Sequence, residues 1–107
     1  MAVDTAKRLY GPTTLAAAAA DTYTVPASTT AIIRSIILTN GDTAARTFTL
    51  SIGADAAGTR LYDAVSIAAN TTLYVPTFIV LTATQKIQAF ADTANKVNLT
   101  LNGIETA

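Results

Sequence analysis

The chain has 107 residues, half of them hydrophobic, with seven basic and seven acidic residues and neither histidine nor cysteine. This length provides one domain with a small core, which no disulfide or thiolate-bound zinc can reinforce. The missing histidine and cysteine remove the commonest general base and the thiol nucleophile, which argues against an enzyme, and the scattered, balanced charges argue against a nucleic-acid partner.

The apolar residues fall in short runs. None approaches the roughly 20 residues needed to cross a bilayer, so no membrane partner is predicted. Residues Met1–Tyr10 lack the apolar stretch of a signal peptide, which predicts synthesis in the cytoplasm. Because a shared face adds buried surface to a small core, self-association is expected.

Residues 1–12 are predicted to form an N-terminal arm that precedes a single β-sandwich domain over residues 13–107. The arm holds the first four candidate interface residues, which are Lys7, Arg8, Leu9 and Tyr10. A free terminus is disordered unless it docks. Docking on a partner subunit and simple fraying therefore remain open alternatives.

Ala16–Ala20 is a run of five alanines. Alanine is the best helix former, but a helix of about two turns without a large apolar stripe is marginal in water. A strand or extended arm is favoured here, and a short helix is the alternative.

The rest of the chain alternates strand-forming segments with turn signals about ten residues apart. The expected strands are 21–25, 31–39, 46–52, 60–67, 71–75, 85–91 and 96–101. Pro26 and Pro76 are expected to end the strands before them, because proline cannot donate to a ladder. The pattern predicts an all-β fold, a β-sandwich or jelly roll of about eight short antiparallel strands.

Two of these segments give further expectations. Residues 46–52 alternate apolar and polar side chains, as a half-buried strand does. Residues 31–39 are apolar on both faces, which predicts a central strand covered on both sides. Asn40-Gly41-Asp42 lies between the two segments and predicts a hairpin turn.

Arg34, inside the most apolar segment, is the fifth candidate interface residue. It is expected to pair with an acidic group on a neighbouring subunit or, as the favoured alternative, to be an exposed charge or to pair with Asp63. The four tyrosines are equally compatible with interface and core-edge positions.

Aspartates are the remaining chemical resource of the chain. Asp55 and Asp63 flank a glycine-containing loop, where a catalytic pair is the alternative to two turn caps, which are favoured. A calcium site that also includes Asp42 fits no known loop spacing. No catalytic residue, metal ligand or cofactor is therefore predicted.

Three parts of the chain carry a resemblance to a known group of proteins. They are Tyr23–Ala27 with Ile32–Asn40, then Arg46–Gly53, and finally Lys96–Glu105, which ends Leu-Asn-Gly-Ile-Glu. In this order they resemble small β-sandwich virion proteins of tailed bacteriophages. Members often have a Gly-Asp turn before the penultimate strand, where this chain has Ala83-Thr84-Gln85, so the register of that turn stays open.

The resemblance implies assembly on a virus particle. Such proteins commonly sit on the capsid exterior as decoration or cement subunits, often as homotrimers bound to the major capsid protein. Other members belong to tails or fibres and contact further virion proteins or the host surface. A sandwich-type carbohydrate-binding module is the alternative from another class, although the chain has no tryptophan to build an aromatic platform.

Overall fold

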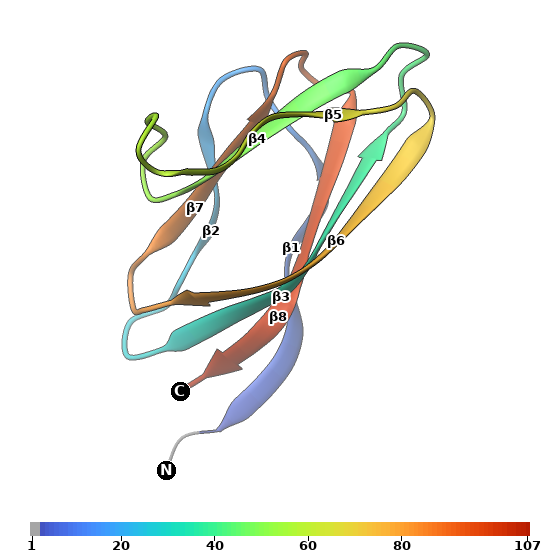
Figure 1. Cartoon of the computed structure of the whole chain (residues 1–107). Coiled ribbons are helices and arrows are strands. Elements are labelled where there is room, and N and C mark those ends of the chain that lie inside the picture. Colours follow the sequence, from blue (N-terminus) through green and yellow to red (C-terminus); the bar gives the residue numbers. More distant parts are fainter. Residues whose placement is uncertain (1–2) are drawn as a thin grey trace.

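The computed structural model describes residues 3–107 and confirms the all-β prediction. It contains eight strands and no helix in this range: β1 (Asp4–Thr14), β2 (Ala20–Thr24), β3 (Thr30–Asn40), β4 (Arg46–Ile52), β5 (Arg60–Ile67), β6 (Thr71–Leu81), β7 (Lys86–Ala91) and β8 (Val97–Thr106). They form two four-stranded antiparallel sheets, the first in the order β1-β8-β3-β6 and the second in the order β2-β7-β4-β5 (Figure 1).

Consecutive strands alternate between the two sheets, except for β4 and β5, which pair as a hairpin. This alternation is the strand order of a jelly roll. The hairpin predicted at Asn40-Gly41-Asp42 is wrong, because β3 pairs with β6 and β8 while β4 pairs with β5 and β7. The turn residues are present, but they carry the chain from one sheet to the other.

The core lies between the two sheets and is built from the inward side of each alternating strand. The sequence pattern was sharpest in β4, β7 and β8, and there the apolar side of the alternation faces the core as predicted. The strand β4 is not half-buried as expected, because Thr49 and Ser51 on its other side are buried as well. The fully buried residues of these strands include Phe48, Leu50, Ile87, Ala91, Val97, Leu99 and Leu101.

The strand β3 is central in the first sheet, but only one of its faces is covered. Ile33, Ile36 and Leu38 are fully buried against the second sheet, whereas Ile32 and Ile37 lie on the other face and remain half-exposed. The prediction of cover on both sides is therefore wrong for the isolated chain. The first sheet has an apolar outer face without a layer over it.

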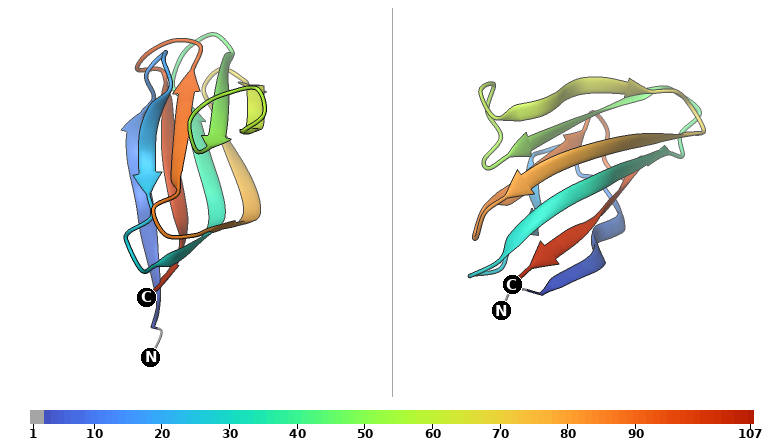
Figure 2. Two further views of the ribbon diagram at one scale, coloured as in Figure 1. Left: turned by 90° about the vertical axis from the view of Figure 1, so that its left-hand side faces the viewer. Right: turned by 60° about the horizontal axis from the view of Figure 1, so that its bottom comes forward.

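The predicted N-terminal arm is part of the sandwich over its described residues. Asp4–Thr14 forms the edge strand β1 and pairs along its length with β8, so the boundary expected between residues 12 and 13 has no counterpart in the fold. Val3 exchanges two backbone hydrogen bonds with Ala107, so the first and last described residues lie side by side at one end of the molecule (Figure 2). Residues 1 and 2 lie outside the described range.

Pro76 does not end its strand as predicted. The strand β6 continues through it to Leu81 because β6 is an edge strand with a single partner, and the ladder to β3 is irregular at Pro76. A missing backbone donor is tolerated at such a position. Residues 16–19 form an exposed, bent connection between β1 and β2. The alanine run is therefore not the short helix, and only Ala20, which opens β2, belongs to the favoured strand.

Candidate interface on the outer face of the first sheet

The outer face of the first sheet presents rows of apolar side chains across its strands. Directly opposed residues in an antiparallel ladder point to the same face. One row joins four strands and consists of Ala6, Ile104, Ile32 and Val80, and a second row contains Ile37 and Tyr74 beside the polar Thr100. The row between them, Arg8, Asn102 and Ser35, is polar. We call this surface the apolar face.

Edge strand β6 makes the most exposed part of the apolar face. Tyr74, Phe78 and Val80 are exposed to 60%, 64% and 54%. Adjacent positions on the same strand, Leu73, Val75 and Ile79, pack against the core. Large apolar side chains gathered on one surface mark an interaction site more often than scattered ones do.

Arg34 lies in the middle of the apolar face. It is the additional residue of a bulge in β3, where Ile33 opposes Gly103 and Ser35 already opposes Asn102. Its guanidinium carbon lies 5.6 Å from the ring centre of Phe78, a cation–π distance. It is exposed, in agreement with the favoured alternative, but it does not pair with Asp63, which binds Arg60.

The other four candidate interface residues are divided between the two sides of β1. Arg8 opposes Asn102 and lies on the apolar face in the same row as Ser35, next to Arg34. Lys7 instead forms an ion pair with Glu105 at 3.1 Å, and Leu9 and Tyr10 pack against the core. The structure therefore brings Arg8 and Arg34 together and separates them from Lys7, Leu9 and Tyr10.

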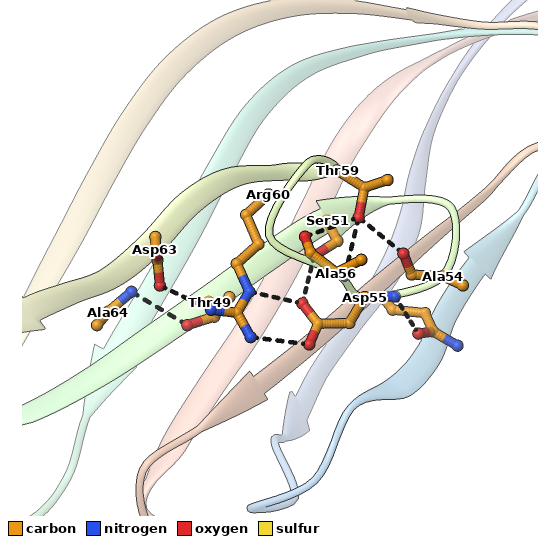
Figure 3. A network of polar contacts seen from close by, with 10 residues as sticks. Thr49, Ser51, Ala54, Asp55, Ala56, Thr59, Arg60, Asp63 and Ala64 are labelled. Carbon is orange, nitrogen blue, oxygen red and sulfur yellow. Dashed lines mark hydrogen bonds and ion pairs between the residues drawn. The ribbon is translucent and has the colours of Figure 1, made fainter.

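The second sheet has a polar outer face, held by a network around Arg60 (Figure 3). Arg60 donates to both carboxylate oxygens of Asp55, at 2.9 and 3.0 Å, and to Asp63 at 3.2 Å. Ser51 also donates to Asp55, at 2.7 Å. The hydrogen bonds from Arg60 and Ser51 hold the pKa of Asp55 below its ordinary value, so this carboxylate stays charged and is not a proton donor.

The same ion pairs bear on the two hypotheses about the aspartates, a catalytic pair and a calcium site. Asp55 and Asp63 meet on Arg60 rather than on each other, and Asp42 binds Arg46. In these pairs an arginine charge already lies beside each carboxylate, which weakens its attraction for a metal ion. Residues 3–107 hold no cluster of potential metal ligands and no ligand-sized pocket, and no helix within them is long and apolar enough to span a membrane.

A buried hydroxyl connects the two sheets near the end where the termini lie. The Tyr23 hydroxyl donates to Glu105, which also accepts from Lys7. Burial and the neighbouring Glu105 raise the pKa of Tyr23 well above its ordinary value, so the hydroxyl remains a donor. The hydrogen bonds from Tyr23 and Lys7 lower the pKa of Glu105.

The lowered pKa of Glu105 predicts an acid-dependent part of stability. A carboxyl group whose pKa is lower in the folded than in the unfolded chain stabilises the fold when the pH is above its unfolded-state pKa. This stabilisation is lost as the pH falls through the folded-state pKa. Tyr23→Phe is expected to lower the unfolding free energy by about 1.5 kcal/mol at neutral pH, and by less as the pH falls from about 5 to 3. Urea titrations at several pH values measure this. Tyr74→Phe, at an exposed tyrosine, is the control, and parallel pH profiles for wild type and Tyr23→Phe would contradict the prediction.

The exposed residues of β6 were not singled out from the sequence. The signal was present, because Tyr74, Phe78 and Val80 alternate with core residues of the same strand. This alternation was not recognised because Pro76 was expected to end the strand, so Phe78 and Val80 fell outside any predicted element. A strand with apolar residues on both sides of the alternation indicates that two layers cover it.

Comparison with known proteins shows the fold of the chain but does not assign it to a family. No family model and no curated protein matches the chain. A chain in the structure of infectious bursal disease virus, Gx strain, aligns at a TM-score of 0.55 and 10% identity, over 98% of this chain and 32% of that one. The Gt strain of the same virus aligns at 0.37 and 11% identity, over 99% and 28%. This protein thus spans about a third of the viral chain whose β-sandwich it shares.

Proposed function

We propose that the chain is a non-enzymatic virion structural protein, a decoration subunit that binds the outside of a phage head and stabilises it. The apolar face carries this proposal, because its exposed aromatic and aliphatic side chains have no cover in the isolated chain. Binding that exists only in the assembled particle adds its free energy to the stability of that particle.

Two further observations support a structural role. A chain in the structure of a virus has the same β-sandwich fold, which supports a virion protein as the proposal. Within residues 3–107 there is no pocket in which a substrate would be enclosed, and Asp55 and Asp63 each form an ion pair with Arg60 instead of with each other. The chain therefore acts through surface contacts. In this proposal it self-associates and binds the major capsid protein.

Electron microscopy of purified virions tests the proposed location. Particles produced with and without this protein are compared, and the particle lacking it is expected to lose density on the exterior of the head and to break at a lower temperature. Loss of density at the tail alone would reject the capsid assignment and favour the tail or fibre alternative.

The carbohydrate-binding alternative has one observation against it. A sugar-binding platform needs the free face of an aromatic ring, but the guanidinium of Arg34 lies over the ring of Phe78. Tyr74 is then the remaining exposed aromatic residue of β6. A decoration subunit uses the same aromatic side chains without requiring an open ring face.

A further inference from the structure

We infer that the partner of the apolar face is a different protein whose contact surface combines apolar residues with carboxylates, and that it is not a second copy of this chain. The inference rests on the proposed function, since it specifies what kind of surface the shell must present. Its basis is the distribution of charge pairs over residues 3–107.

Nearly every carboxylate in this range already has a cation. Six of the seven acidic residues form ion pairs with Lys7, Arg46, Arg60 or Lys86. The seventh, Asp4, accepts a hydrogen bond from Thr106 at 2.7 Å. Arg46 and Arg60 each serve two carboxylates, so a contact between the apolar face and another surface of a second copy would have to draw on a carboxylate that already has an ion-pair partner.

Three basic residues take part in none of these pairs, and two of them lie on the apolar face. Arg8 lies in the same row as Ser35, Arg34 is the bulge residue next to Ser35, and β8 separates the two strands that carry the arginines. Adjacent strands are about 4.8 Å apart, which places the two backbones about 10 Å from each other. The third unpaired base, Lys96, lies in the turn before β8, where its charge acts on Asp42.

A second copy is a poor fit to this arrangement. Two apolar faces packed on each other would place four arginines in one interface, together with only the two Asp4 carboxylates. Like charges brought together without compensation oppose association. A partner that supplies carboxylates opposite Arg8 and Arg34 gains from the same two charges, while its apolar residues cover Tyr74, Phe78 and Val80.

Charge reversal tests the inference on particles prepared without this subunit. Arg8→Glu, Arg34→Glu and, as the matched control, Lys96→Glu are added to such particles, and binding is measured by co-sedimentation. We expect each arginine variant to bind at least about tenfold more weakly and Lys96→Glu to bind within about threefold of wild type. Arg8→Glu is the cleaner of the two, because Arg34 also contacts Phe78. Raising the salt to about 0.5 M is expected to weaken wild-type binding and to strengthen the binding of the Arg8→Glu/Arg34→Glu double variant, because salt screens an attraction in the first and a repulsion in the second.

The outcomes separate this inference from the proposed function. If the wild type does not bind the particles, the proposed function fails and the inference fails with it. If the wild type binds but the arginine variants bind as tightly as Lys96→Glu, the proposed function stands and the inference is wrong. Sedimentation velocity addresses the second copy, because a wild-type oligomer that Phe78→Ser dissolves would show that this chain covers its own apolar face.

Discussion

Asn40→Ala is expected to lower the free energy of unfolding by about 3 kcal/mol. The Asn40 side chain is fully buried, and its amide nitrogen reaches the carbonyl oxygens of Ala44, Ile67 and Ala68 at 3.0, 3.1 and 3.2 Å. Its oxygen accepts from the Asp42 backbone at 2.9 Å. The side chain thus fastens the end of β3 to two connections between the sheets, and alanine would leave a buried carbonyl without a donor.

Thermal unfolding of purified protein measures this loss as a fall of roughly 15 °C in the melting temperature. Asn98→Ala is the matched control, because Asn98 is a half-buried asparagine on β8, at the same level as Asn40 along the first sheet. We expect it to cost less than about 1 kcal/mol. Equal losses for the two variants would show that the Asn40 network does not hold the connections together.

Gly103→Ala is the second large effect, with an expected loss of at least about 3 kcal/mol. Gly103 is buried on β8 opposite Ile33, and a Cβ atom there would lie 2.0 Å from the carbonyl oxygen of Ile32 and 3.0 Å from Leu9. A backbone oxygen has nowhere to move without separating β3 from β8. Those two strands are the centre of the first sheet, so the damage is expected to spread beyond the site.

Gly58→Ala provides the control for this prediction. A Cβ atom at Gly58 meets nothing within 4 Å, and the residue lies in the exposed loop between β4 and β5. Alanine there is expected to be neutral or to stabilise by about 0.5 kcal/mol, because it restricts the unfolded chain. Urea unfolding of both variants checks the contrast, which a stable Gly103→Ala would contradict.

Local pattern was sufficient for the strands that have one polar and one apolar side. The alternation in β4, β7 and β8 located these strands and their buried apolar residues, but it missed the burial of Thr49 and Ser51 and the continuation of β8 beyond Leu101. It was not sufficient for β1, because no single side of Asp4–Thr14 is apolar throughout and none of its residues is fully buried. Its place in the sheet comes from pairing with β8, nearly a whole chain length away, which local sequence does not encode.

The candidate interface was only partly predictable for a related reason. Arg34 stood out because a charge in an apolar run is unusual, and Arg8 because it precedes a Gly-Pro turn. That Arg34 lies beside the row that contains Arg8 depends on a bulge in β3 and on the register of β1 with β8. The connection at Asn40-Gly41-Asp42 shows the same limit, since turn residues determine local geometry but not which sheet the next strand joins.

The central claim is that the apolar face is buried in the assembled particle, and one pair of substitutions tests it most directly. Phe78→Ser removes an exposed aromatic side chain from this face. Leu61→Ser removes a comparably exposed aliphatic side chain from β5 in the second sheet. Co-sedimentation with particles lacking the subunit is predicted to show binding about thirtyfold weaker for Phe78→Ser, equivalent to about 2 kcal/mol, and unchanged binding for Leu61→Ser. Unchanged binding of Phe78→Ser, or a loss confined to Leu61→Ser, would contradict the account.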